Sequence, residues 1–280
     1  MWFGTRTFMQ EIRDPDIDPD YEVVGWGEST QFISGGLGVS ASDVGHREVF
    51  LTWSNVSRAE ARKITDYADR VYGRGLIYWV DPVAADVNVL PQSWAVPALA
   101  GSDAVPLAGD ARPTISANTD QSQGYPSEKA TYEIAEDTTL RSIFVPIPSG
   151  FVAWVGIHGD VSAQDFVKVT PYTGAFTGTE VFPTILSVST TTRVNTEISD
   201  GATGLELSLD NTSAGSPALV GMIVQILPDG VTPATGGFLS GQGHSGMAFL
   251  GRPVVVPNTV ADGLELVTVS AKLGEVGEWV

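Results

Sequence analysis

The chain has 280 residues, of which 42% are hydrophobic and 9% aromatic. This apolar content suffices for one large or two ordinary folded domains and excludes a disordered chain. Cysteine is absent, which excludes disulfides, thiolate catalysis and cysteine-bound zinc. The formal net charge of -18 repels phosphate, so we expect no sequence-specific binding of nucleic acid.

The N-terminal segment carries no targeting signal that we recognise. Met1–Arg6 reaches polar residues at once, and no later stretch has the roughly 20 apolar residues that span a bilayer, so no membrane insertion is expected. Aspartates then alternate from Asp14 to Asp20 in a pattern similar to a calcium loop. The glycine and glutamate positions of an EF-hand hold Pro19 and Gly25, so we predict a solvated loop and leave calcium binding open.

Residues Ser57–Tyr72 predict an amphipathic helix. Ser57 and Glu60 have the spacing of a capping box, in which each side chain satisfies a backbone N–H group of the first turn. Apolar residues then recur every three or four positions as far as Val71, which places them on one face. Gly73 is suited to end the helix in a left-handed conformation.

Most of the remaining chain predicts strands separated by turns rich in glycine and proline. The expected strands are residues 47–53, 75–80, 140–146, 151–158, 166–170, 186–198, 204–209, 219–227 and 264–273. Many short strands and one helix favour a mainly β fold of sandwiches or barrels.

Composition indicates how these elements are organised. Residues 91–123 are rich in Ala, Pro, Ser, Gly and Asp and show little periodicity, which predicts a linker or long loop. Residues 124–240 contain a self-contained run of strands, of the size of a small β-sandwich. Residues 241–280 are too few for a domain of their own, so we expect them to fold with residues 1–90 and the middle domain to be an insertion.

Motifs for catalysis and metal binding are weak. Gly241–Gly246 fits the dinucleotide pattern G-x-G-x-x-G, but Pro253 follows too soon for the helix that this site needs, so we predict a glycine-rich loop. The three histidines, His46, His158 and His244, lack metal-ligand spacing. The sequence therefore predicts no catalytic residue, no metal and no cofactor.

Aromatic residues in the middle domain suggest a saccharide-binding surface, because rings stack on sugar faces. The candidates for carbohydrate contact are Tyr125, Tyr132, Trp154 and Tyr172. Trp154 lies within the apolar strand Phe151–His158, where a buried core role is the favoured alternative.

The order of elements at the two ends of the chain resembles a known family. A strand ending Phe50–Trp53 is followed by the capped helix and by Gly73–Pro82, and Gly241–Gly246 and Leu273–Trp279 come far downstream. This order resembles the distal tail proteins among the minor tail proteins of long, flexible-tailed (siphovirus-type) bacteriophages that infect actinobacteria. The resemblance implies an N-terminal β-barrel with one packed α-helix, completed by the C-terminal strands, and an inserted jelly-roll β-sandwich similar to galectins and carbohydrate-binding modules.

The same resemblance implies a structural role without catalytic residues. Such proteins form a hexameric ring that joins the tail tube to the tail-tip complex, with the inserted domain projecting outward. The expected partners are further copies of the chain, the tail tube protein, the tail-tip hub or tail-associated protein and other minor tail proteins. The expected location is the distal end of the virion tail, after assembly in the host cytoplasm. One alternative is an adhesion module for host cell-wall carbohydrate; a cell-wall hydrolase is another, which no pattern favours.

Overall fold

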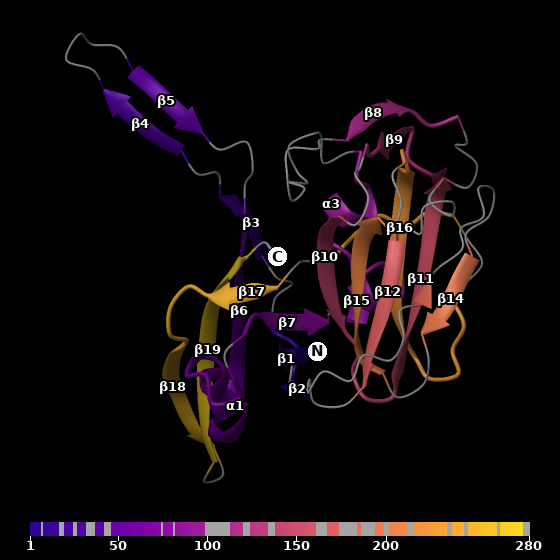
Figure 1. The fold of residues 1–280 in the computed structure, drawn as a ribbon. Coiled ribbons are helices and arrows are strands. Elements are labelled where there is room, and N and C mark those ends of the chain that lie inside the picture. The colour runs from indigo at the N-terminus through magenta and orange to yellow at the C-terminus, as the bar shows by residue number, and fades with distance from the viewer. Residues whose placement is uncertain are drawn as a thin grey trace. The chain divides into compact units, whose positions relative to one another are not determined.

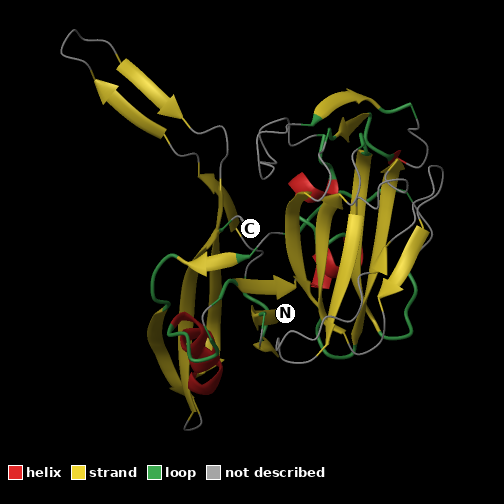
Figure 2. Cartoon of the chain, in the orientation of Figure 1, coloured by secondary structure: helices red, strands yellow, loops and turns green. Residues whose placement is uncertain are grey.

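The protein was analysed as a computed structural model, and strands dominate its secondary structure (Figure 2). The prediction of a mainly β fold is therefore confirmed. The residues that the structure describes are 1–6, 8–16, 20–24, 27–31, 37–41, 46–73, 75–80, 82–98, 113–119, 124–133, 138–160, 167–173, 184–185, 194–198, 202–211, 215–233, 237–243, 246–261 and 264–276.

The chain divides into two compact units. Unit 1 contains Met1–Glu11 and Tyr78–Gly246, and unit 2 contains Ile12–Ile77 and Met247–Val276. Unit 2 thus combines an early and a late part of the sequence. The observed division differs from the expected one at residues 1–11, 78–90 and 241–246, which belong to unit 1. Trp2, Val80 and Leu90 pack in or against the core of unit 1, and the backbone N–H groups of Gln242 and Gly243 donate to the carbonyls of Asn88 and Leu90.

Unit 2 is built on two long antiparallel strands from opposite ends of the sequence, β6 (His46–Ser57) and β19 (Leu264–Glu275). β3 pairs with β6, and β17 and β18 pair with β19; these strands are β3 (Asp20–Val24), β17 (Met247–Phe249) and β18 (Val254–Ala261). Ile77 of β7 (Ile77–Val80) lies opposite Met247. β4 (Gly27–Gln31) and β5 (Leu37–Ala41) form a two-stranded sheet of their own (Figure 1). Closure into a barrel is not shown by these described pairings.

The predicted helix is present as α1 (Arg58–Ala68), and its capped start is confirmed. Ser57 accepts a hydrogen bond from the backbone N–H of Glu60 at 3.2 Å, and Ala61, Ile64 and Tyr67 are buried. The end of the helix was predicted wrongly. Asp69 is the C-cap, and Arg70 takes the left-handed conformation (φ 61). The backbone N–H groups of residues 69–71 bond carbonyls of the last turn, so the helix closes before Gly73 is reached.

Unit 1 is an antiparallel β-sandwich of two sheets (Figure 1). In order across the sheet, the four-stranded sheet contains β10 (Thr138–Pro146), β15 (Ala202–Asn211), β12 (Val167–Thr173) and β13 (Thr184–Ile185). The five-stranded sheet contains β14 (Val194–Ile198), β11 (Phe151–Asp160), β16 (Ala218–Pro228), β9 (Glu128–Thr131) and β8 (Thr114–Ala117). Unit 1 also holds the hairpin β1 (Trp2–Thr5) and β2 (Phe8–Glu11), and helices α2 (Pro82–Val87) and α3 (Gln92–Ala95).

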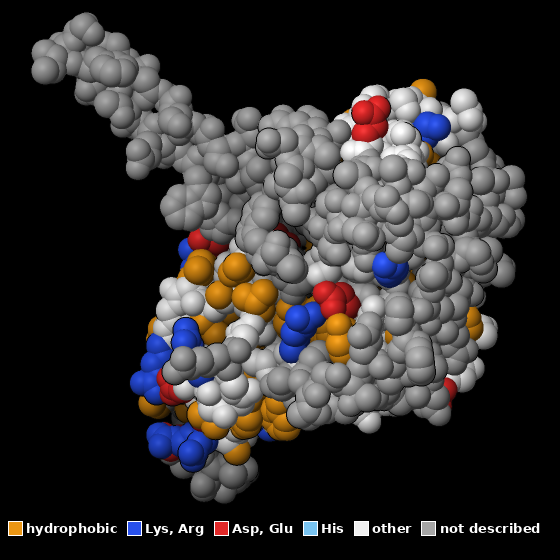
Figure 3. Space-filling view, in the orientation of Figure 1, with side chains coloured by type: hydrophobic (Ala, Val, Ile, Leu, Met, Phe, Trp, Pro, Cys, Tyr) orange, Lys and Arg blue, Asp and Glu red, His pale blue; other side chains and the backbone are white. Residues whose placement is uncertain are grey.

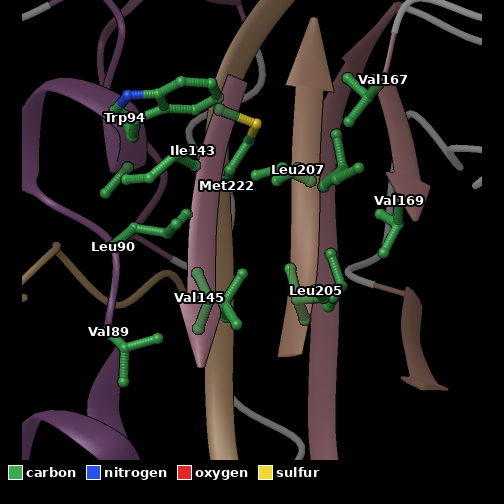
Figure 4. Packing of buried hydrophobic residues seen from close by; sticks show 14 of the residues in the cluster. Val89, Leu90, Trp94, Ile143, Val145, Val167, Val169, Leu205, Leu207 and Met222 are labelled. Carbon is green, nitrogen blue, oxygen red and sulfur yellow. The ribbon is translucent and has the colours of Figure 1, made fainter. Parts of the chain in front are cut away.

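The core of the sandwich combines alternate residues of both sheets with side chains from the segment before it. The two sheets contribute Val145, Leu207 and Met222 to the core, among other residues. Leu90 and Trp94 pack beside them (Figure 4). Trp94 is only 2% exposed. Residues 91–98, expected to begin a linker, are therefore part of the folded unit, and so is β8, which lies within the same expected linker (residues 91–123) and pairs with β9. The high content of Ala, Pro and Ser in this segment predicted a linker, although the segment also contains the buried Trp94 and the short helix α3 that carries it.

The same segment covers the part of β16 that lies beyond its short pairing with β9, which includes only Ala218 and Leu219 of β16. The backbone N–H of Val89 donates to the carbonyl of Val224 (2.9 Å), as a neighbouring strand would. Asn88 then donates to the carbonyl of Met222 (3.0 Å) and accepts from the N–H of Val224 (3.0 Å). Groups at a sheet edge are thus satisfied within the chain, which prevents pairing with another molecule at this edge.

Candidate functional site

Two of the four predicted carbohydrate-contact residues are buried. Tyr132 is fully buried in the sandwich core, and Tyr125 is 5% exposed. The Tyr125 ring stacks on the buried His158 ring, with centroids 3.8 Å apart, and Phe238 packs nearby. Both tyrosines contact protein on all sides, so neither presents a face on which a sugar could stack, and their prediction as contact residues is corrected.

Trp154 lies on the outer face of the five-stranded sheet. Its neighbours Ala153 and Val155 point into the core, so the indole points away from it. The side chain is half-buried and stands opposite Gln225 of β16, which donates to the backbone carbonyl of Asp86. The indole Nε1 is buried and has no hydrogen-bond partner within the described part of the chain. The core role that the apolar strand favoured for Trp154 is therefore not observed.

Tyr172 lies on the opposite side of the sandwich, on the outer face of the four-stranded sheet. On β12 and β15 the apolar residues Val167, Val169, Leu205 and Leu207 point into the core (Figure 4). The alternate residues must then point outward. Five of these outward residues are polar and half-buried: Lys168, Thr170, Tyr172, Glu206 and Ser208. The structure thus gathers one predicted aromatic residue with four polar side chains on one face.

The centre of this face is a hydrogen-bonded pair, Tyr172 and Glu206. The phenol Oη of Tyr172 donates to Oε2 of Glu206 at 2.6 Å. Tyr172 stands opposite Gly204, so Glu206 is its diagonal neighbour across the two strands. A hydrogen bond to a charged acceptor is stronger than one between neutral groups, and it fixes the orientation of the Tyr172 ring.

Phe144 supports the Tyr172 ring from β10, which lies on the other side of β15. The two ring centroids are 6.4 Å apart, and Tyr78 meets Phe144 edge-on at 5.4 Å. The Arg6 guanidinium lies 4.2 Å from the centroid of the Phe144 ring. Gly204 makes this packing possible, because a Cβ atom there would approach the Phe144 ring to 2.3 Å. Phe144 is therefore buried, and Tyr172 keeps the partly exposed position in front of it.

This arrangement has the chemistry of a saccharide site. The electron-rich face of an aromatic ring attracts the C–H groups of a sugar ring. A carboxylate can accept several hydrogen bonds, so Glu206 can bond Tyr172 and still accept from sugar hydroxyls. Thr170 and Ser208 add hydroxyl groups that both donate and accept. We call Lys168, Thr170, Tyr172, Glu206 and Ser208 the tyrosine face.

Sequence reasoning identified Tyr172 but missed its partners. The signal was present as strict alternation in Val167–Tyr172 and in Leu205–Leu209, where every second residue is apolar. Alternation predicts one buried and one outward face for each strand, but it does not say which strands are neighbours. Pairing β12 with β15 is what brings Glu206 to Tyr172.

The other motifs do not form sites within the described residues. No group of three or more His, Asp or Glu side chains in the described ranges is placed to hold a metal ion. Asp16 accepts from the backbone N–H of Ser54 and lies 3.7 Å from Arg13, while Asp18 falls outside the described residues, as does His244. None of the helices described is both long and apolar enough to cross a bilayer.

Comparisons with known proteins place the chain in no family. No family profile matches it, and no curated protein is significantly similar. Among solved structures it is similar to TmCBM61 in complex with β-1,4-galactotriose, at 17% sequence identity. The similarity covers 49% of this chain and 97% of that one, with a TM-score of 0.29, which is too low to assign a fold or a ligand.

Proposed function

We propose that unit 1 is a carbohydrate-binding β-sandwich and that the tyrosine face takes the saccharide. The observation that carries this proposal is the half-buried Tyr172 ring, held by Glu206 on the outward side of a sheet. Neighbouring hydroxyls supply further hydrogen bonds at fixed positions. A sheet face with one aromatic ring and several polar groups suits a sugar, which has apolar C–H faces and a polar rim.

The charge of the chain favours a neutral saccharide. The net charge of -18 repels acidic polymers. The tyrosine face itself carries one acidic and one basic residue, Glu206 and Lys168, and three hydroxyl groups. A neutral oligosaccharide can form hydrogen bonds with these groups, whereas the negative charge of the protein would repel a polyanion.

Binding can be tested with the full-length protein on an array of neutral and acidic oligosaccharides, followed by calorimetric titration of the best ligand. Tyr172→Ala removes the ring and should weaken binding at least about tenfold, which corresponds to ~1.4 kcal/mol. Glu206→Gln keeps the shape but loses the charge-assisted hydrogen bond, and should weaken binding by a smaller factor.

Tyr72→Ala provides the matched control, because Tyr72 is another half-buried tyrosine and belongs to unit 2. It should bind as the wild type does. Equal affinity of the Tyr172→Ala and Tyr72→Ala proteins, or binding confined to acidic saccharides, would contradict the proposal.

A second proposed function is the structural one that the sequence resemblance implies, a hexameric ring at the distal end of a phage tail. Its support is the composition of unit 2, in which β6 from the first part of the chain pairs along its length with β19 from the last part. The resemblance likewise expects the C-terminal strands to complete the N-terminal domain. In this proposal the copies of unit 2 form the ring, and the partners are the tail tube and tail-tip proteins.

A further inference from the structure

The end of unit 2's sheet carries an apolar strand, β18. β18 pairs with β19, and no other strand among the described residues pairs with it. Three successive residues of β18 are exposed: Val254 (61%), Val255 (40%) and Val256 (50%). Successive residues point to opposite faces, so both faces of this edge are apolar and open to solvent.

Exposed edges of this kind are normally protected. Proteins cover them or place charges, proline or bulges on them, because a free row of N–H and C=O groups pairs with other chains. This chain protects the edge of β16 with Asn88 and Val89. Prolines flank the three valines, Pro253 directly before β18 and Pro257 within it, and the irregular register begins only after Pro257. Val254–Val256 itself carries no proline, charge or bulge, so its backbone N–H groups remain available between the two prolines, and we call these three residues the valine edge.

The charge pattern favours a second copy of the same chain as the partner. Two molecules that each carry a net charge of -18 repel each other wherever acidic groups meet. β18 has no charged residue along its whole length, Val254–Ala261. Nearby on β19, Glu265 is paired with Arg58 at 2.6 Å. Lys and Arg side chains also appear together with hydrophobic ones on unit 2 (Figure 3). Copies of the chain can therefore meet here with little repulsion.

The valine edge is also self-complementary. If two copies pair antiparallel with Val255 opposite Val255, then Val254 of each stands opposite Val256 of the other. Apolar side chains then face apolar side chains, and the free backbone groups pair across a two-fold axis. We propose that β18 is a self-association edge that joins two copies of this chain by antiparallel pairing of their valine edges.

This inference goes beyond saccharide binding and does not depend on it. It is also separate from the contacts of a ring, which are head-to-tail, whereas an edge that pairs with itself makes a two-fold contact. A protein that binds no saccharide, or forms no six-fold ring, can still pair in this way. Failure of either proposed function is thus distinguishable from failure of this one.

The test is the mass of the full-length protein in solution, measured by light scattering over a concentration series. Val254→Lys places a charge on the edge and should halve the mass at concentrations where the wild type is paired, with at least about a tenfold weaker association. Val71→Lys is the matched control, because Val71 is 62% exposed and lies just beyond α1 in the same unit. That variant should keep the wild-type mass.

A cysteine cross-link identifies the contact. The chain has no cysteine, so Val255→Cys introduces a single thiol. Opposed residues of an antiparallel pair have Cα atoms about 4.5–5.5 Å apart, which suits a disulfide. Mild oxidation should give a covalent dimer with Val255→Cys and none with Val71→Cys. A wild type that stays monomeric, an unchanged mass of Val254→Lys, or a paired protein that Val255→Cys does not cross-link would overturn the proposal.

Discussion

Asn88 shows how much one buried side chain can organise in this protein. It is fully buried and uses both its donors and both its acceptor positions. Its amide nitrogen donates to the carbonyls of Met222 and Leu239, and its oxygen accepts from the N–H groups of Val224 and Leu90. One residue thereby connects the segment before the sandwich, the strand β16 and the segment after it.

Replacing Asn88 with aspartate should destabilise unit 1 strongly. Asn88→Asp keeps the shape, but it removes two donors and brings a negative charge against two carbonyl oxygens in a buried place. We expect a loss of about 3–5 kcal/mol, in the range of other uncompensated buried charges, measured by urea unfolding.

The matched control is Asn258→Asp, since Asn258 is exposed and its partners are the side chains of Asn55 and Thr268. We expect this change to stay within about 0.5 kcal/mol. Similar losses for the two variants would show that Asn88 does not act through its buried hydrogen bonds.

At the scale of elements, close backbone packing explains why glycine occupies positions 241 and 243, in the segment after the sandwich. The backbone N–H of Gly243 donates to the carbonyl of Leu90 at 3.1 Å. A Cβ atom at Gly243 would lie 1.7 Å from the carbonyl oxygen of Val89, and one at Gly241 would lie 2.4 Å from that of Leu90. Only glycine allows the two backbones to approach this closely.

Gly243→Ala should therefore separate this segment from residues 88–90. We expect the free energy of unfolding to fall by about 1–3 kcal/mol, as in other overpacked sites, and protease sensitivity near residue 243 to rise. Gly75→Ala is a suitable control, because a Cβ atom there meets nothing within 4 Å. If alanine is tolerated equally well at both positions, close packing is not the reason for glycine at 243.

Local patterns in the sequence were sufficient to predict single elements. The capping box predicted the start of α1, and runs of apolar and β-forming residues bounded by turns predicted the long strands β6, β11, β15, β16 and β19. What depends on distant residues was not predictable. The burial of Trp94, the edge cover by Asn88 and the meeting of Tyr172 with Glu206 all require knowing which strands are neighbours. The end of α1 was missed because a non-glycine residue, Arg70, takes the left-handed conformation.

At the scale of the whole molecule, saccharide binding and self-association fall in different units. The tyrosine face belongs to unit 1, and the valine edge to unit 2. A variant at one surface should therefore leave the other unaffected: Tyr172→Ala should still pair, and Val254→Lys should still bind saccharide. This separation allows each proposal to be tested in the intact protein.

The ring proposal predicts six-fold particles. Electron microscopy of the purified full-length protein should give class averages with six-fold symmetry, because closed rings arise from head-to-tail contacts. Val254→Lys should retain the rings and remove only the pairing between copies. Averages that show nothing larger than two-fold pairs would contradict the ring and leave the valine edge intact.

The paired residues Ile77 and Met247 mark where the chain leaves unit 2 and where it returns. These two residues lie opposite each other on adjacent strands. The two ends of the segment 78–246 are therefore attached to unit 2 at neighbouring positions. A segment attached in this manner can be exchanged for another whose ends are equally close, provided that residues 1–11 find new contacts.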